Sequence, residues 1–152
     1  MPELILRAVR ADDYDGWRPL WDGYNAFYGR SGATALDETT TQATWSRFLD
    51  PAEPVHAFVA ERERNLLGLA HCVLHASTIS TAPSCCLQDL FTLQAARGGG
   101  VASALIDAVC AFARRTGCAR VYWQTHEGNA VARRLYDRVA ERSGFIVYRR
   151  AP

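Results

Sequence analysis

The stretch "QAARGGGVASALIDAV", residues 94–109, joins an arginine and three consecutive glycines to an apolar run with helical spacing. A strand-like segment ends near Leu93 and the helical pattern begins near Gly100, so the glycines lie in a strand–turn–helix connection. The first N–H groups of a helix have no partner within it, and the helix dipole places positive charge there. Glycines let an anion reach these groups without meeting a Cβ atom, and Arg97 adds a cation. The stretch therefore predicts an anion site of the kind that holds phosphate.

Two common phosphate motifs do not fit this turn. The Walker pattern requires a lysine, and all 17 basic residues of the chain are arginine. The dinucleotide fingerprint fails at its third glycine, which is Ser103 here, and lacks its usual place in a first strand–helix–strand unit. A flexible turn that binds nothing remains the alternative for the stretch alone.

Hydrophobic periodicity predicts the elements that position the turn. Strands are predicted over 4–9, 55–61, 66–75, 85–93, 119–125 and 145–150. Helices are predicted from about Trp17, from a cap at Asp37 or Thr39, and over 101–115 and 129–142. Pro19 and Gly23 predict that the first helix is broken or starts late. The first half forms an antiparallel meander and the second alternates strand with helix, so we expect one α/β domain over residues 1–152.

Composition excludes several classes of function. The formal net charge is +1, which gives no electrostatic reason to bind nucleic acid or an anionic membrane. No apolar run reaches the roughly 20 residues that cross a bilayer, and the first residues do not resemble a signal peptide, so a cytoplasmic protein is expected. The five cysteines lack the spacing of metal ligands and, without a secretion signal, are not expected to form disulfides.

The surroundings of the turn resemble a known family. Arg97-x-x-Gly100-x-Ala102 resembles the Arg/Gln-x-x-Gly-x-Gly/Ala signature that opens the coenzyme A helix of the GCN5-related N-acetyltransferase (GNAT) superfamily. Asn129 and Tyr136, seven residues apart, look like its second motif, and "LQDLFT" at 87–92 looks like its central strand. The histone and polyamine acetyltransferase-related branch looks most similar. The resemblance implies a mixed, mostly antiparallel sheet of about six or seven strands, splayed at its centre, with about four flanking helices.

The resemblance also implies roles for particular residues, with acetyl-CoA as the co-substrate and no metal. Main-chain groups of the central strand would bond the acetyl carbonyl and the pantetheine arm, which involves Leu90, Phe91 and Thr92. The pyrophosphate would lie against Arg97, Gly98, Gly99, Gly100, Val101, Ala102 and Ser103.

Two residues of the predicted helix over 129–142 have implied roles near the co-substrate. Tyr136 would be the general acid for the departing thiolate, and its alternative is a core tyrosine. Asn129 would bond the main chain or pantetheine, and its alternative is a helix cap.

The acceptor amine arrives protonated, so the family's reaction also needs a proton acceptor. Asp89 lies on the predicted central strand and is the first candidate, with a solvated carboxylate as the alternative. His126, Glu127 and water are further candidates for the base. Of the aromatic residues on the first two helices, most belong to the core and one or two face the acceptor: Trp21, Tyr24, Tyr28 and Trp45.

The resemblance thus implies an N-acetyltransferase that moves the acetyl group directly to a primary amine in a ternary complex. The acceptors left open are polyamines, other small amines, amino acids, antibiotics and the lysine side chains of peptides or proteins. A non-catalytic acyl-CoA sensor is the alternative, although it needs neither Tyr136 nor Asp89. Members of the family often form homodimers through their C-terminal strands, and residues 145–150 offer such an edge.

Overall fold

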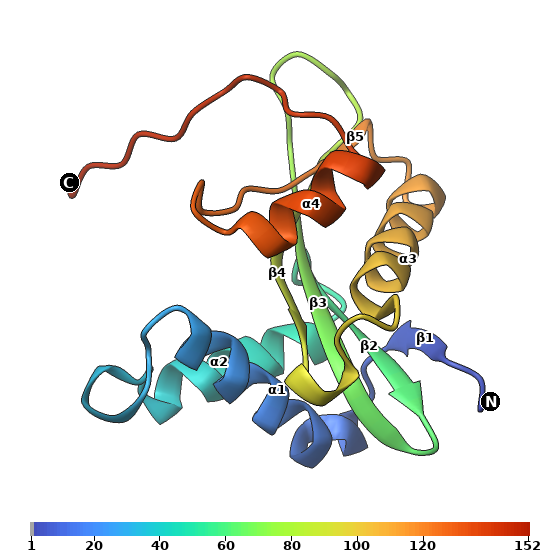
Figure 1. Ribbon diagram of the computed structural model, residues 1–152. Helices are drawn as coiled ribbons and strands as arrows, with labels where there is room; N and C mark the ends of the chain where they lie inside the picture. The colour runs from blue at the N-terminus through green and yellow to red at the C-terminus, as the bar shows by residue number, and fades with distance from the viewer. Residues whose placement is uncertain (1) are drawn as a thin grey trace.

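The computed structural model describes residues 2–152, which form three layers with a five-stranded sheet in the middle (Figure 1). The strands are β1 Ile5–Ala8, β2 Val55–Arg62, β3 Asn65–His75, β4 Ser84–Thr92 and β5 Arg120–Tyr122. They lie in the sheet in this same order. The first three pairings are antiparallel, and β4 pairs with β5 in parallel. The prediction of a mixed, mostly antiparallel sheet is confirmed.

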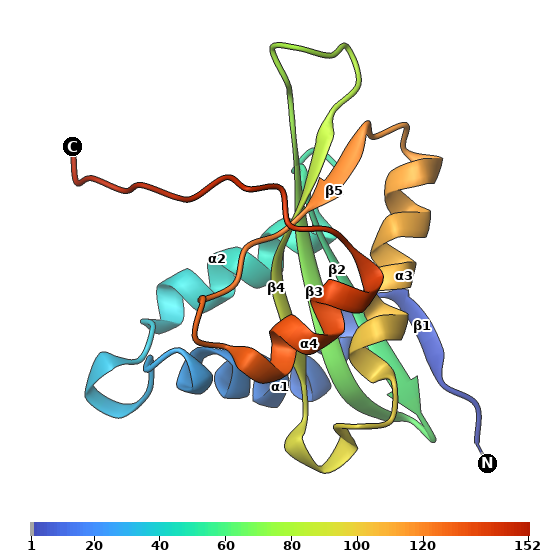
Figure 2. The ribbon, with the colours of Figure 1, turned by 45° about the horizontal axis from the view of Figure 1, so that its top comes forward.

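The prediction of six or seven strands is wrong for the described chain. Residues 145–150 form no strand, and the C-terminal segment runs away from the body of the molecule (Figure 2). A strand requires a neighbour for its N–H and C=O groups, and no strand within residues 2–152 pairs with this segment. Its apolar side chains are mostly exposed, at 90% for Phe145 and 88% for Tyr148. The apolar composition of residues 145–150 therefore led to the prediction of a strand that the sheet does not contain.

Four helices flank the sheet, as expected: α1 Tyr14–Phe27, α2 Glu38–Leu49, α3 Val101–Arg115 and α4 Ala130–Val139. Asp37, rather than Thr39, caps α2, because its Oδ1 accepts a hydrogen bond from the Thr40 N–H at 2.7 Å. None of the helices within residues 2–152 is long and apolar enough to cross a membrane.

The expectation that α1 is broken at Pro19 or Gly23 is wrong, since the helix is continuous. Packing of its buried inner face stabilises the helix despite Pro19 and Gly23. This face consists of Trp17, Leu20, Trp21 and Tyr24. Gly23 serves the packing, because a Cβ atom there would lie 2.7 Å from Cζ of Phe91 on β4. The glycine therefore allows α1 to approach the central strand closely.

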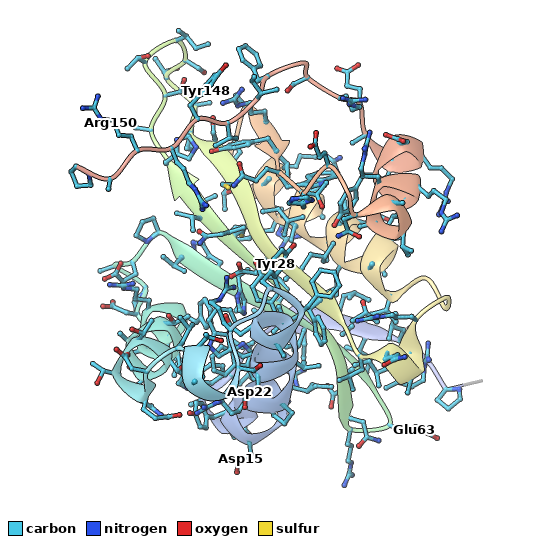
Figure 3. The ribbon with its side chains drawn as sticks, turned by 60° about the vertical axis from the view of Figure 1, so that its left-hand side comes forward. Asp15, Asp22, Tyr28, Glu63, Tyr148 and Arg150 are labelled. Atoms are coloured by element: carbon cyan, nitrogen blue, oxygen red, sulfur yellow. The ribbon has the colours of Figure 1, made fainter. Side chains whose placement is uncertain are left out.

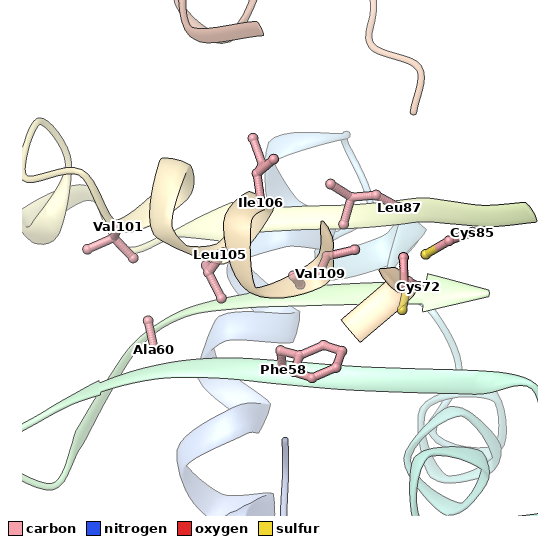
Figure 4. Packing of buried hydrophobic residues seen from close by; sticks show 11 residues of the cluster. Phe58, Ala60, Cys72, Cys85, Leu87, Val101, Leu105, Ile106 and Val109 are labelled. Carbon is pink, nitrogen blue, oxygen red and sulfur yellow. The ribbon is translucent and has the colours of Figure 1, made fainter. Parts of the chain in front are cut away.

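The two faces of the sheet have separate cores. The helices α1 and α2 cover one face with their tryptophans, together with Leu69 of β3. On the other face, α3 buries Val101, Leu105, Ile106 and Val109 against strand residues such as Phe58 and Cys72 (Figure 4). A Cβ atom at Gly68 would lie 2.9 Å from the Phe91 carbonyl oxygen and 3.0 Å from Leu105 Cδ1. This close packing fixes the N-terminus of α3 beside the end of β4.

Candidate active site

The central feature of the site is the side of β4 that faces β5. Pairing between the two strands involves only Ser84, Cys85 and Cys86 of β4, so β5 lies along only the first part of β4 (Figure 2). The Leu93 N–H donates to the Leu67 carbonyl of β3 at 2.9 Å. Because successive residues of a strand alternate sides, the N–H groups of Leu90 and Thr92 point the other way. The second half of β4 thus offers unpaired main-chain groups to an extended ligand.

The glycine turn leads from this strand to α3. Gly98 and Gly100 have φ angles of +80° and +82°, a left-handed conformation that glycine adopts without a steric penalty. Cβ atoms at these two positions would meet nothing within 4 Å, so the surface of the turn is open. Gly100 caps α3 without a side-chain hydrogen bond, and the first turn of α3 contains no acidic residue. The N–H groups of Val101, Ala102 and Ser103 are therefore accessible to an anion.

Arg97 connects the turn with the end of β4, where the strand has no neighbour on its β5 side. Its Nε donates to the Thr92 carbonyl oxygen at 3.1 Å, and its guanidinium lies 5.7 Å from the centre of the Phe91 ring. The guanidinium is thereby held near the end of β4, and the residue as a whole is exposed. The hydroxyl Oγ1 of Thr92 is buried and has no hydrogen-bond partner in the described chain. Such an orphaned group is costly unless a ligand or water satisfies it.

Tyr136 lies on α4 as predicted, and Asn129 is the N-cap that precedes this helix. The Asn129 Oδ1 accepts from the Ala132 N–H at 3.4 Å, which is the capping alternative. Tyr136 is half-buried and makes an edge contact with Trp123, with 5.5 Å between the ring centres. Burial raises the pKa of Tyr136, and the Tyr28 phenol raises it further. The phenol therefore keeps its proton at neutral pH and can donate it.

Asp89 is buried, so the solvated alternative is wrong. Its exposed fraction is 9%, and its Oδ2 lies 2.8 Å from His71 Nδ1 on β3. The Trp17 indole N–H donates to His71 Nε2 at 3.0 Å. Because indole only donates, Nε2 is the accepting nitrogen and Nδ1 carries the proton that Asp89 accepts. This chain of hydrogen bonds holds the carboxylate in one position.

Two tyrosine phenols lie near the Asp89 carboxylate: that of Tyr24 on α1 and that of Tyr28, the C-cap of the same helix. Burial raises the pKa of Tyr24, and the charge of Asp89 raises it further. The same two causes raise the pKa of Tyr28, which Figure 3 labels near the middle of the molecule. The Tyr28 phenol also raises the pKa of Tyr136, so the row of phenols extends from the buried Asp89 carboxylate toward α4. A carboxylate and neutral phenols in one place can accept and donate protons within the same reaction.

Other predicted residues are not part of this cluster. His126 and Glu127 are exposed in the turn after β5, where His126 Nδ1 accepts from the Gly128 N–H at 3.0 Å. Neither forms a hydrogen bond or ion pair with Asp89 among the described residues. Trp21 and Trp45 belong to the core beneath α1 and α2. Within residues 2–152, no group of three or more His, Cys, Asp or Glu side chains is arranged to hold a metal ion.

Sequence reasoning missed two residues of the cluster, His71 and Arg30. His71 is a single histidine in the apolar run 66–75, and the sheet register places it opposite Asp89. Arg30 follows α1, and its guanidinium lies 5.8 Å from the Tyr24 ring centre and 5.6 Å from that of Tyr28. A polar residue inside an apolar strand was the available signal for His71. No comparable signal in the sequence marks Arg30.

Comparisons with known proteins agree with the acetyltransferase resemblance of the sequence. The model of the acetyltransferase (GNAT) family matches residues 17–140. The chain is 28% identical over 149 residues to the D-amino-acid N-acetyltransferase HPA3 of Saccharomyces cerevisiae, covering 97% of this chain and 90% of that protein. It is also 28% identical over 147 residues to the uncharacterized N-acetyltransferase YhfO of Bacillus subtilis, covering 95% of each.

Solved structures share the fold at lower identity. The aminoglycoside N-acetyltransferase AAC(6')-Iy in complex with CoA superposes with a TM-score of 0.81 at 19% identity, covering 99% of this chain and 96% of that chain. The same enzyme in complex with a bisubstrate analogue, CoA-S-monomethyl-acetylneamine, gives a TM-score of 0.83 and covers 99% of both chains.

Proposed function

The chain belongs to the acetyltransferase (GNAT) family, and we propose that it transfers the acetyl group directly to a small primary amine in a ternary complex. It is an acetyl-CoA-dependent N-acetyltransferase, so acetyl-CoA is the co-substrate. When bound, acetyl-CoA supplies an activated acetyl thioester. The observation that carries the proposal is the unpaired side of β4, which ends at the open glycine turn and passes the buried Asp89.

The chain's own residues fit acetyl-CoA in two places. The main chain from Leu90 to Thr92, through Phe91, would bond the acetyl carbonyl and the pantetheine, and the buried Thr92 hydroxyl would gain a partner. A backbone N–H at the carbonyl oxygen also stabilises the negative charge that develops there. The pyrophosphate would be held by the turn and the first turn of α3, namely Arg97, Gly98, Gly99, Gly100, Val101, Ala102 and Ser103.

Asp89 and Tyr136 would handle the two protons of the reaction. The neutral amine attacks the carbonyl carbon, the C–N bond forms, and the C–S bond then breaks to release the CoA thiolate. As the amide forms, its nitrogen also gives up a second proton, which returns through water to Tyr136 after that phenol has protonated the thiolate. Asp89 would take the proton that the ammonium must lose, directly or through a water, while His71 keeps the carboxylate in place. Tyr136 would donate its phenolic proton to the departing thiolate, since its raised pKa keeps it protonated. A non-catalytic sensor would need neither group, which favours turnover.

The acceptor is proposed at the level of a small primary amine. Relatives of similar sequence or fold are named for D-amino acids and for aminoglycosides, both of which carry such amines. Polyamines and lysine side chains share the reacting group, and a panel of amines separates these classes.

A homodimer is proposed as the working state. Phe145, Ile146, Val147 and Tyr148 are exposed at 90%, 74%, 69% and 88%, and β5 is one of the two edge strands of the sheet. The C-terminal segment of a second copy, added beside β5, would bury these side chains and pair the edge. Light scattering of the eluting protein should give twice the mass of the chain, and truncation after Gly144 should give the monomer. A monomeric full-length chain would contradict this assembly.

Calorimetric titration of acetyl-CoA, and then of free CoA, into the purified protein tests the binding part of the proposal. Both ligands should bind the wild type, and Gly100→Trp should abolish binding because the indole fills the open turn. Gly117→Trp is the matched control, since Gly117 has a similar φ of +77° at the other end of α3 and also faces open space. A folded wild-type protein that binds neither ligand would refute the proposed site.

A further inference from the structure

Arg30 is held in a fixed position beside the proposed acceptor site. Its main-chain N–H donates to the Asn25 carbonyl oxygen at 2.8 Å, and its Nε donates to Asn25 Oδ1 at 2.6 Å. Asn25 is itself buried, and its Nδ2 donates to the Trp21 carbonyl oxygen at 2.9 Å. The guanidinium is therefore fixed through Nε alone. Its Nη1 and Nη2 groups make no hydrogen bond or ion pair with the rest of residues 2–152.

The Arg30 guanidinium and the Asp89 carboxylate act on the same two phenols. The guanidinium lies within 6 Å of both ring centres, at 5.8 Å from Tyr24 and 5.6 Å from Tyr28. Burial and then the charge of Asp89 raise the pKa of Tyr28, whereas Arg30 acts in the opposite direction. The same opposition holds at Tyr24. One negative and one positive group thus flank a pair of aromatic side chains.

We propose that the acceptor is an α-amino acid, whose amine lies at Asp89 and whose carboxylate pairs with the two free Nη groups of Arg30. This inference rests on the proposed acetyl transfer at Asp89. A guanidinium binds a carboxylate through two parallel hydrogen bonds, a geometry that a free pair of Nη groups can provide. A free α-amino acid carries both required charges, an ammonium and a carboxylate, on groups bonded to the same carbon atom.

The same charges disfavour the other amines under consideration. A polyamine or an aminoglycoside carries further positive charges near its reacting amine, and one of these would approach Arg30. Like charges in a partly buried site repel strongly. A lysine side chain within a protein has no carboxylate near its amine and would leave the guanidinium without a partner. The site therefore selects for an acceptor with a neighbouring negative charge.

Steady-state kinetics with matched acceptors tests this inference. The panel consists of D- and L-alanine, D- and L-phenylalanine, the corresponding amino acid amides, phenethylamine, spermidine and an aminoglycoside. Wild-type kcat/KM for the best amino acid should exceed that for its amide by about 10- to 100-fold, the value of one charged hydrogen-bonded contact. This comparison needs no variant and so does not depend on the folding of one.

Variants of Arg30 then identify the group responsible. Arg30→Gln should lower kcat/KM for the amino acid by a similar factor, mainly through KM, and leave kcat/KM for the amide and the Kd of acetyl-CoA unchanged. Arg30→Lys keeps the positive charge but lacks the two parallel N–H donors of the guanidinium, so it should recover only part of the loss. Arg47→Gln, at an exposed position of α2, is the matched control and should behave as wild type.

Three results would overturn the inference. The first is equal or faster acetylation of amides, phenethylamine, spermidine or the aminoglycoside, which leaves the proposed acetyl transfer standing. The second is an Arg30→Gln variant that loses activity equally with every acceptor, which would make Arg30 a structural residue. The third is a higher Kd for acetyl-CoA in Arg30→Gln, which would assign the guanidinium to the co-substrate. Failure of the wild type to bind acetyl-CoA and to acetylate any amine would instead refute the proposed function together with the inference.

Discussion

Asp89→Asn is the substitution that separates the chemistry of the site from its structure. The asparagine side chain keeps an oxygen that can accept the His71 Nδ1 hydrogen bond, now 2.8 Å long, but it loses the charge. A hydrogen bond to a charged group contributes about 1.5–3 kcal/mol and a neutral one about 0.5–1.5 kcal/mol, so the loss is about 1 kcal/mol. For a chain of this size that lowers Tm by roughly 2–4 °C. The variant should therefore fold.

The effect of Asp89→Asn on activity should be much larger than its effect on stability. A positioned base accelerates such reactions by about 10²- to 10⁴-fold, which corresponds to roughly 2.7–5.5 kcal/mol of activation free energy. We expect kcat/KM at neutral pH to fall within this range. The loss should shrink as pH rises, because more of the acceptor is then deprotonated in solution. The rate is best followed by loss of thioester absorbance, because the partly exposed free thiols of Cys86, Cys110 and Cys118 compete for thiol reagents.

Asp12→Asn provides the matched control for this experiment. Asp12 is an exposed carboxylate before α1, and its substitution makes the same chemical change without touching the site. The control should keep wild-type Tm and kcat/KM. A folded Asp89→Asn variant whose kcat/KM stays within about threefold of wild type, less than 1 kcal/mol, would refute the role of Asp89.

Three further outcomes are expected. Tyr136→Phe should lower kcat by about 10²-fold with unchanged Kd for acetyl-CoA, measured by steady-state kinetics and calorimetry; an unchanged kcat would leave the tyrosine as a packing residue. Gly68→Ala should cost about 1–3 kcal/mol in urea unfolding, because its Cβ atom would lie 2.9 Å from the Phe91 carbonyl oxygen; wild-type stability would contradict that packing. Burial and the charge of Asp89 raise the pKa of Tyr24 in the folded protein. The contribution of the protonated phenol to the free energy of unfolding is therefore fully present below the unfolded-state pKa of about 10, and it falls as the pH rises above that value. Tyr24→Phe should reduce that fall in unfolding experiments between about pH 8 and 11, and an identical fall would contradict it.

Local sequence signals predicted the elements that depend on local interactions. The range 101–115 has the periodicity of an amphipathic helix between two glycines, and α3 has these bounds. The hairpin of β2 and β3 was predicted because a short polar turn separates two apolar runs. The glycine turn was also accessible from the sequence, since positive φ angles and an open surface are properties of the glycines themselves.

Features that depend on distant parts of the chain were predicted poorly. The segment 145–150 has the composition of a strand, but whether it forms one depends on a neighbour that the single chain does not provide. The Asp89–His71 contact depends on the register between β3 and β4, which shifts next to His71. Periodicity gives the face of a residue and not its partner across the sheet. The position of Arg30 depends on its hydrogen bonds to Asn25 at the end of α1, which no sequence pattern encodes.

Direct detection of the acetylated product tests the central claim most simply. Purified protein is incubated with acetyl-CoA and the panel of amines, and mass spectrometry measures N-acetylated product together with free CoA. We predict equal amounts of the two products with at least one small amine, and loss of both in Asp89→Asn. Binding of acetyl-CoA without any acetylated amine would contradict the claim that this site transfers the acetyl group.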